Sequence, residues 1–176
     1  MKKTITIIIT VIILASTVHS CEKDDICPSG SSETPLLIIT FYDATNRELP
    51  KDVPTLRIIG EGQTNFLNTL EDFKDRETTD SIGIPLKSFE TSTSFTFISN
   101  SADEEDTDIE TGNSDIVTFS YINKEVFVSR GCGFINNYEN LASSPNDGGD
   151  TRWIISVEVV NANVKNQDST HVKIYH

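Results

Sequence analysis

The chain has 176 residues and carries 14 Lys and Arg against 27 Asp and Glu, a formal net charge of −13. This length fits one domain, and the charge disfavours nucleic-acid binding, because a basic patch that neutralises several phosphates is not expected from so few cations. Hydrophobic residues make up 36% of the chain, which is lean but sufficient for a core. Three cysteines are too few for a disulfide scaffold, and their odd number needs an explanation.

Residues 1–20 predict a secretory signal peptide. Lys2 and Lys3 form a positive start, Ile5–Leu14 is an apolar run, and small and polar residues stand directly before Cys21. The apolar run is shorter than the roughly 20 residues that a membrane-spanning helix needs, so an anchor or a buried helix is only the alternative. A cysteine in this place resembles a bacterial lipoprotein signal, in which Cys21 is lipidated and begins the mature chain. Ordinary cleavage without lipidation is the other interpretation.

The segment after Cys21 bears on location. Glu22–Asp25 resembles the signal that sends lipoproteins of Bacteroidota to the outer face of the outer membrane. We therefore expect an outer-membrane lipoprotein held by acyl chains such as palmitate, each buried CH₂ contributing about 0.8 kcal/mol. Exposure at the cell surface is favoured, and a periplasm-facing position is the alternative. Residues 21–34 form the lipidated tether, and Pro28–Ser32 make it flexible by composition.

Residues 35–176 predict a single all-β domain. Short runs rich in Ile, Val, Phe and Thr alternate with turn residues. About eight strands with this punctuation indicate a single β-sandwich, immunoglobulin-like or related, with a barrel as the alternative. The runs expected as strands are Leu36–Tyr42, Thr55–Gly60, Ser81–Lys87, Ser94–Ser99, Ile116–Tyr121, Val126–Phe134, Trp153–Val160 and Thr170–His176.

Three of these segments carry finer expectations. Leu36–Phe41 is almost continuously apolar, which predicts a central strand buried on both faces. In Trp153–Val159 every second residue is apolar, so the odd-numbered side chains should share the buried face. Turns are expected at Tyr121–Lys124 and Ser144–Gly149, and Asn65–Glu77 should be an irregular loop or a single helical turn.

Five stretches together resemble one protein family. They are Cys21–Cys27, Pro35–Asp43, Thr78–Ile82, Val126–Gly133 and His171–His176. The family consists of small, functionally uncharacterised lipoproteins of Bacteroidota, mostly flavobacteria, and the resemblance covers essentially the whole mature chain. It implies a secreted, lipid-anchored β domain, and it implies no activity, cofactor or catalytic residue.

The cysteine count becomes even if Cys21 carries lipid, since Cys27 and Cys132 then remain. In the periplasm or at the cell surface such thiols are expected to oxidise. Cys132 stands between Gly131 and Gly133, whose small size lets another segment approach closely. We predict a Cys27–Cys132 disulfide that ties the end of the tether to the sheet. Two unpaired thiols, or a redox-active Cys132, are the alternatives.

The densest run of charge, residues 103–115, contains the candidate metal ligands. Asp106, Asp108 and Glu110, followed by Gly112, partly match a Ca²⁺-binding loop, in which carboxylate oxygens are the ligands. The match fails in detail, because the glycine comes one residue late and the twelfth position is not Glu. A solvated loop is favoured and weak Ca²⁺ binding is the alternative. No other cofactor is expected.

Groups for catalysis are few. His19 leaves with the signal peptide, so His171 and His176 remain, both in or beside the last expected strand. Ser129 and Asp80 could complete a hydrolase triad with His171, but their spacing does not link them. The sequence contains no Gly-x-Ser-x-Gly, His-Glu-x-x-His or phosphate loop. We expect the His171 ring at the sheet surface and a protein that is not an enzyme; a hydrolase is the less favoured alternative.

The remaining expectation is a non-catalytic binding or envelope-assembly accessory. Its partner would be an outer-membrane protein or a glycan, in addition to the membrane itself, which it contacts through the lipid anchor. Glycan sites need exposed aromatic rings, and Trp153 is the only tryptophan. If Trp153 is exposed beside Tyr138, a surface glycan-binding module is favoured; the alternating pattern instead places Trp153 in the core and favours the accessory.

Overall fold

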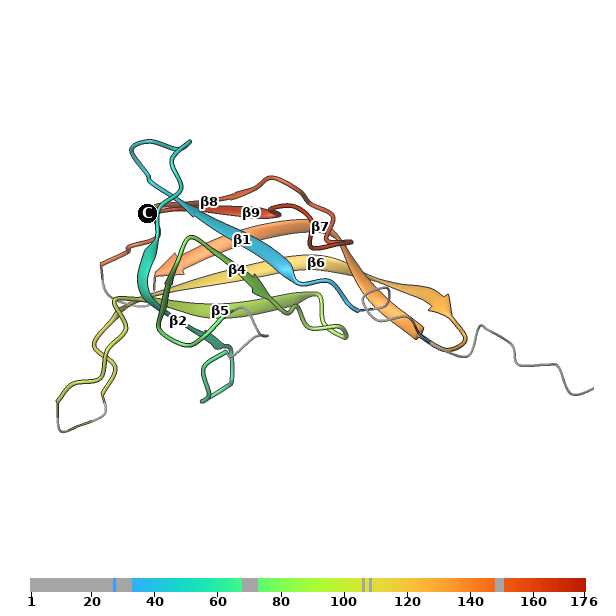
Figure 1. The fold of residues 1–176 in the computed structure, drawn as a ribbon, viewed down its shortest axis with the longest axis horizontal. Coiled ribbons are helices and arrows are strands. Elements are labelled where there is room, and N and C mark those ends of the chain that lie inside the picture. The colour runs from blue at the N-terminus through green and yellow to red at the C-terminus, as the bar shows by residue number, and fades with distance from the viewer. Residues whose placement is uncertain (1–26, 28–32, 68–72, 106, 108, 148–150) are drawn as a thin grey trace, which may run out of the picture. The chain divides into compact units, whose positions relative to one another are not determined.

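The protein is built from strands joined by turns and loops (Figure 1). The computed structural model describes residue 27 and residues 33–67, 73–105, 107, 109–147 and 151–176. These ranges contain nine strands and no helix, so the all-β prediction is confirmed. The strands are β1 (Leu37–Tyr42), β2 (Val53–Gly60), β3 (Glu77–Thr79), β4 (Ser81–Ile84), β5 (Ser92–Ser99), β6 (Asn113–Ser129), β7 (Gly133–Asp147), β8 (Ser156–Val159) and β9 (Val172–Tyr175).

The strands form two sheets in a sandwich-like arrangement, as predicted. One has the order β4-β1-β9-β8 and the other the order β3-β2-β5-β6-β7. β1 pairs in parallel with β9, so that Ile39 lies opposite Val172, while β1 pairs with β4, and β8 with β9, in antiparallel fashion. The first and last described strands therefore lie side by side in the middle of the four-stranded sheet (Figure 1).

The core lies between the inner faces of the two sheets. Aliphatic and aromatic side chains alternate inward along each strand and are removed from water, which is the main force that stabilises such a sandwich. The inward residues of the central strands are Leu37, Ile39, Phe41, Leu56, Ile58, Phe95, Phe97, Val117, Phe119, Val172 and Ile174.

The expectation that Leu36–Phe41 is buried on both faces is wrong. In β1 the buried residues Leu37, Ile39 and Phe41 alternate with half-buried Ile38 and Thr40. A sheet of a sandwich has one face in the core and one face outward, so even a central strand is covered on one side only. The apolar outward residue Ile38 hid this alternation in the sequence.

The largest error in the strand boundaries concerns β6 and β7. β6 continues through Tyr121–Lys124, where a turn was expected, and the chain turns inside Val126–Phe134, which was expected as a strand. Gly133 has a φ of 72°, which only glycine adopts without a steric cost, and it marks the end of that turn. β7 then extends into Ser144–Gly149, the site of another expected turn. The polar residues Asn123 and Lys124 therefore do not end β6.

The alternation expected for Trp153–Val159 is also shifted. Ile154 is fully buried, whereas Ile155 is mostly exposed, and regular strand structure begins only at Ser156. Residues 151–155 have no regular strand structure, so the period of two expected for a strand does not apply there. Val157 and Val159 pack against the core, as expected.

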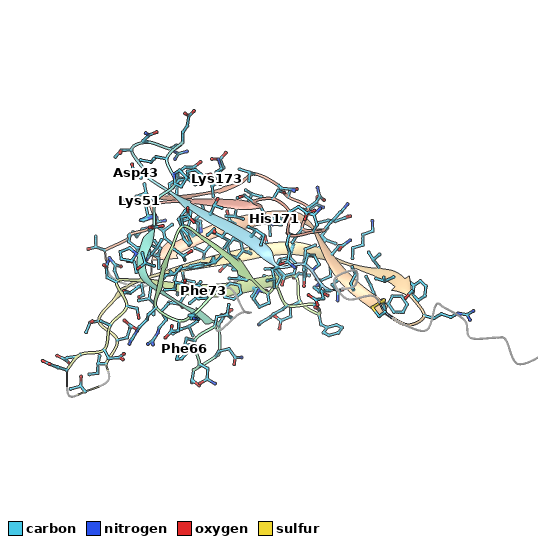
Figure 2. The ribbon with its side chains drawn as sticks, viewed as in Figure 1. Asp43, Lys51, Phe66, Phe73, His171 and Lys173 are labelled. Atoms are coloured by element: carbon cyan, nitrogen blue, oxygen red, sulfur yellow. A yellow bond between two sulfur atoms is a disulfide. The ribbon has the colours of Figure 1, made fainter. Side chains whose placement is uncertain are left out.

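The segment Asn65–Glu77 contains no helix in its described residues and ends in β3, a short strand that the sequence did not predict. Residues 68–72 lie outside the described residues. Phe66 forms an isolated bridge with Ile59, and Phe73 is buried in the core; both side chains are labelled in Figure 2.

The chain divides into two compact units. The larger comprises Glu33–Val126 and Ile135–His176 and contains the core described above. The smaller comprises Met1–Ser32 and Phe127–Phe134, and the structure describes its residue Cys27 and its segment Phe127–Phe134. The predicted signal peptide, residues 1–20, and most of the predicted tether, residues 21–34, lie outside the described residues.

Candidate functional site

A groove of about 420 Å³ lies on the outward face of the five-stranded sheet, over β2, β5 and β6. Its floor follows the strand register, since Ile59 stands opposite Thr96 and Thr96 opposite Ile116. These three side chains are half-buried, while their neighbours along each strand point into the core, as the alternation of a strand requires. The groove therefore exists because one row of outward residues is small or branched.

The groove offers both hydrogen-bonding and apolar groups. The hydroxyls of Ser94 and Thr118 lie 2.9 Å apart on neighbouring strands. Glu61 and Gln63 belong to the turn after β2 that closes one end, where the Gln63 N–H donates to the Gly60 carbonyl at 3.0 Å. Hydroxyl, amide and carboxylate groups around an apolar floor are suited to holding a ligand by contact and hydrogen bonds.

A cluster of charges lies on the same outward face of β2, two residues before Ile59. The Arg57 guanidinium donates two hydrogen bonds to Asp75, at 3.0 and 2.7 Å, and a third to Glu110 at 3.0 Å. Its Cζ atom lies over the Phe66 ring, 5.0 Å from the ring centre, at a cation–π distance. The hydrogen bonds to Asp75 raise the pKa of Arg57 and outweigh the opposing effect of burial.

A second arginine completes this cluster. Arg76 forms a fork-like ion pair with Asp103 and donates to the Ser101 hydroxyl at 3.0 Å. Its φ of 62° is uncommon for a residue other than glycine. The bond to Asp103 raises the pKa of Arg76, and the same pair lowers the pKa of Asp103. We call Arg57, Asp75, Arg76, Asp103 and Glu110 the arginine cluster.

Glu110, a predicted Ca²⁺ ligand, belongs to the arginine cluster. Burial acts to raise the pKa of its carboxyl group, but hydrogen bonds from the Gly112 N–H, the Ser101 hydroxyl and the Ala102 N–H, with the charge of Arg57, lower it overall. Both carboxylate oxygens accept hydrogen bonds within the protein. These donors compete directly with a cation for the oxygens.

The other two predicted Ca²⁺ ligands, Asp106 and Asp108, lie outside the described residues. Within the part of the chain that the structure describes, no three His, Cys, Asp or Glu side chains are grouped so that they could hold a metal ion. The loop itself is closed by an isolated bridge between Asp103 and Glu110.

The expectation that His171 lies at the sheet surface is wrong. His171 is fully buried directly before β9 (labelled in Figure 2), and burial lowers the pKa of its ring. Its Nδ1 accepts the main-chain N–H of Ile38 at 3.1 Å, and its own N–H donates to the Ile38 carbonyl at 2.9 Å. The ring thus replaces a missing strand partner at the start of β1, a role that its position in the sequence does not reveal.

The hydrolase alternative required His171 to act on Ser129 with Asp80. In the described structure, His171 Nε2 is buried without a hydrogen-bond partner, and the hydroxyl of Ser129 accepts the N–H of Cys132 at 3.0 Å. The carbonyl of Asp80 accepts the N–H of Phe41 at 2.7 Å. Ser129 belongs to the smaller compact unit, whereas Asp80 and His171 belong to the larger one.

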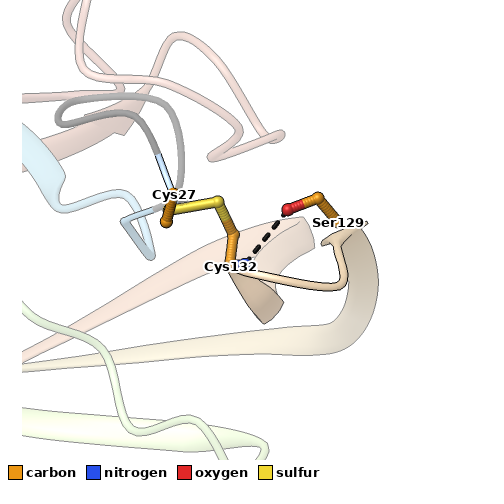
Figure 3. The surroundings of a disulfide bond; sticks show 3 residues. All are labelled: Cys27, Ser129 and Cys132. Atoms are coloured by element: carbon orange, nitrogen blue, oxygen red, sulfur yellow. Dashed lines mark hydrogen bonds between the residues drawn. A yellow bond between two sulfur atoms is a disulfide. The ribbon is translucent and has the colours of Figure 1, made fainter. Parts of the chain in front are cut away.

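Cys27 and Cys132 are joined in the structure, with their sulfur atoms 2.14 Å and their Cα atoms 4.8 Å apart (Figure 3). The two residues are thus a disulfide-capable pair, as the sequence predicted. Cys132 lies in the turn between β6 and β7, where its N–H donates to Ser129 (Figure 3). Cys21, the predicted lipidation site, lies outside the described residues.

Trp153 and Tyr138 do not form an exposed aromatic site. Tyr138 is fully buried and donates its hydroxyl to the Leu86 carbonyl at 2.9 Å. Trp153 is half-buried against the core, and its indole N–H donates to the Phe97 carbonyl at 3.3 Å. Its neighbours include His176, whose ring centre lies 5.5 Å away.

Sequence reasoning missed the groove and the arginine cluster. The signal for the cluster was weak but present, because Arg57 is the one charged residue in the apolar run Thr55–Gly60. A cation in such a strand of an acidic chain is expected to find carboxylates. Which carboxylates it finds cannot be read from the sequence, since Asp75 and Glu110 lie 18 and 53 residues away.

The fold and the groove define a two-sheet β-sandwich with an open, partly polar depression on one sheet. Residues 55–176 match the model of a family of unknown function, DUF6452, and the chain belongs to this family. The matched range contains the groove and the arginine cluster. Comparisons with curated proteins and with solved structures find no match. Within the described ranges, no helical segment has the length and hydropathy to cross a bilayer.

Proposed function

We propose that the protein is a lipid-anchored, non-catalytic accessory of the outer membrane that binds a partner protein through the groove on β2, β5 and β6. The observation that carries the binding role is the groove itself, a row of Ile59, Thr96 and Ile116 flanked by hydroxyls. The Ser94 and Thr118 hydroxyls are hydrogen-bonded to each other, and hydroxyls are poor nucleophiles unless a base activates them. They are good partners for the polar main chain of a bound segment.

The arginine cluster supports this function from beside the groove, because Arg57 stands on the same outward face of β2 as the lining residue Ile59. Arg57 fixes the loops that carry Asp75 and Glu110 against the outward face of β2. A binding surface that is ordered before the partner arrives loses less entropy on association. The cluster is therefore a positioning element, and its charges are already neutralised largely by one another.

A protein partner fits this surface better than a glycan. Sugar rings stack on exposed aromatic faces, but the aromatic residue at the groove, Phe95, is buried and points to the core. A glycan-binding module is therefore the second choice, although Glu61 and Gln63 could bind sugar hydroxyls. A Ca²⁺-binding module is supported less, because Glu110 is already bonded to Arg57 and to main-chain N–H groups.

The anchor is supported by the sequence. An apolar run of signal-peptide length ends in small and polar residues directly before Cys21. Cys27 and Cys132 are joined, which leaves Cys21 as the remaining cysteine. We place the protein on the outer membrane, exposed at the cell surface, with a periplasm-facing position as the alternative.

Photo-crosslinking in living cells tests the binding role. A photoreactive amino acid replaces Thr96 on the groove floor, and a matched variant carries it at Ile155, which is exposed elsewhere in the larger unit. We expect the Thr96 position to crosslink to one outer-membrane protein, and the crosslink to disappear when Thr118→Arg fills the groove. Equal crosslinking from both positions, or survival of the crosslink in Thr118→Arg, contradicts the proposal.

Mass spectrometry of the protein from cell membranes tests the anchor. The mature chain should begin at Cys21 with acyl chains attached, and Cys21→Ser should abolish both the acyl mass and the partition into detergent. An unmodified Cys21 in membrane-extracted protein contradicts the anchor and leaves the groove result unaffected.

A further inference from the structure

Two exposed aromatic side chains flank the turn between β6 and β7, Phe127 near the end of β6 and Phe134 near the start of β7. Phe127 is 57% and Phe134 is 60% exposed, and their ring centres lie 5.2 Å apart in an edge-to-face arrangement. Both belong to the smaller unit, together with Cys132 and its partner Cys27. Large apolar side chains in water are costly, and the protein leaves more than half of each of these two residues exposed to solvent.

The charge of this segment differs from that of the chain. The chain has 27 Asp and Glu, but residues 127–134 contain none, and their one charged residue is Arg130. A carboxylate near a lipid surface is unfavourable, whereas a cation and aromatic rings are both residue types that suit a headgroup region. The segment is therefore the kind of surface that a bilayer interface accepts.

The position of the disulfide restricts where this segment can be. Cys27 is six residues after Cys21, and six extended residues span at most about 20 Å. The Cα atoms of Cys27 and Cys132 are 4.8 Å apart, and Phe134 is two residues beyond Cys132. If Cys21 carries lipid, the turn is held within a short distance of the bilayer surface at all times.

We propose that Phe127 and Phe134 insert into the interface of the bilayer that holds the acyl chains, as a second membrane contact beside the lipid. This inference rests on the lipid anchor proposed above. The lipid supplies the attachment, the disulfide brings the turn to the same place, and the two rings enter the boundary between headgroups and acyl chains. A single lipidated residue lets the turn rotate about the tether. The lipid and the two inserted phenylalanine rings together limit the orientation of the turn relative to the bilayer.

The experiment uses tryptophan fluorescence in the protein extracted from membranes and reconstituted into phosphatidylcholine vesicles. Brominated lipids quench tryptophan on contact, and bromines near the headgroup or deep in the acyl chain report depth. The variants are Phe127→Trp and Phe134→Trp, with Ile109→Trp as the matched control, because Ile109 is equally exposed at 59% but lies in an acidic loop. The wild type, whose only tryptophan is Trp153, gives the background.

We expect shallow bromines to remove most of the added fluorescence of Phe127→Trp and Phe134→Trp and to leave that of Ile109→Trp unchanged. A second outcome is that the mass of the protein includes acyl chains while all three variants are quenched equally and weakly. That result overturns the proposal that the rings insert, and it leaves the anchor intact. If the mass shows no acyl chain, the anchor is overturned. Quenching of the tryptophan variants is then measured at saturating vesicle concentration, and absence of quenching there overturns the proposed insertion of the rings as well.

Hydrogen exchange on the unmodified sequence gives an independent measurement. The main-chain amide hydrogens of residues 127–134 should exchange more slowly when the acylated protein is in vesicles. The comparison is the same protein in detergent-free solution, with its acyl chains bound by a carrier. The same comparison in the double variant Phe127→Ser with Phe134→Ser should show a smaller change. Equal protection in both proteins contradicts the inference, even if the tryptophan variants fold poorly.

Discussion

The buried carboxylate of Asp115 accepts the main-chain N–H of Trp153 at 2.9 Å, and the same oxygen accepts the N–H of Ile154 at 2.7 Å. Asp115 lies near the start of β6 and Trp153 comes 38 residues later, after β7. The Asp115 side chain thus fixes the main chain at Trp153 and Ile154, where the segment after β7 again packs against the core. It also explains why Ile154 is buried and the alternation expected from the sequence is shifted.

Asp115→Ala should lower the free energy of unfolding by about 2–4 kcal/mol, because two buried N–H groups lose their acceptor. Urea unfolding measures the loss, and the emission of Trp153 should shift to longer wavelength in the native state. Asp115→Asn is the control, since its side-chain oxygen can still accept. Equal losses in the two variants would show that the charge, and not the acceptor, matters.

The paired hydrogen bonds between Arg57 and Asp75 lead to a second prediction. The two side chains are only 16% and 14% exposed, so removal of the arginine leaves carboxylates of the arginine cluster poorly solvated. Arg57→Met should lower the free energy of unfolding by about 1–3 kcal/mol. Lys87→Met breaks the exposed pair with Glu90 and should change it by less than about 0.5 kcal/mol. Similar values for both variants would contradict the difference in burial.

Stability should fall with acid in two separate ranges of pH. Burial lowers the pKa of His171 below that of the unfolded chain, about 6.5, so the unfolded state takes up a proton first and stability declines as pH falls below that value. The pKa of Glu110 is also lowered, so its contribution is present above the unfolded value of about 4.3 and is lost on further acidification. Burial lowers the pKa of His176 too, which adds to the first range.

Variants separate the two ranges. His171→Gln should flatten the loss of unfolding free energy between pH 6.5 and pH 5, measured by urea titrations at each pH, and should leave the lower range unchanged. Glu110→Gln should flatten the lower range only. An unchanged slope for both variants would mean that other groups, such as Asp103, control the acid dependence.

The sequence predicted those parts of the fold in which local pattern and burial agree. β5 alternates Phe95 and Phe97 inward with threonine outward, and its limits were found within two residues. β6 was divided in error, because the strand continues through the polar residues Asn123 and Lys124. His171 was misplaced because its burial depends on the main chain of Ile38, 133 residues away. The groove and the arginine cluster depend on such long-range neighbours, and no local pattern contains them.

Gly112 is needed for space rather than for its backbone angle. A Cβ atom at this position would lie 2.5 Å from a methyl carbon of Ile98 and 2.8 Å from the carbonyl oxygen of Ser99. Gly112→Ala should therefore lower the free energy of unfolding by about 1–3 kcal/mol. It should also disturb Glu110, which accepts the Gly112 N–H at 2.9 Å. Thermal unfolding of Gly112→Ala, of Ile98→Ala and of the double variant measures both, because alanine at position 98 lacks the methyl carbon that a Cβ at position 112 would meet. A double loss smaller than the sum of the two single losses identifies the steric cause.

The disulfide provides the last prediction. Cys27 and Cys132 are 105 residues apart, so their bond restricts most of the unfolded chain. The chain-entropy model assigns a stabilisation of about 4–5 kcal/mol to a loop of this length, as an upper value. Urea unfolding with and without a reductant should show a loss of up to that amount in the wild type. Cys27→Ser with Cys132→Ser should start at the lower stability and should not respond to the reductant, because no bond remains to be broken. A reductant effect in that double variant, or none in the wild type, would contradict a stabilising bond between these two residues.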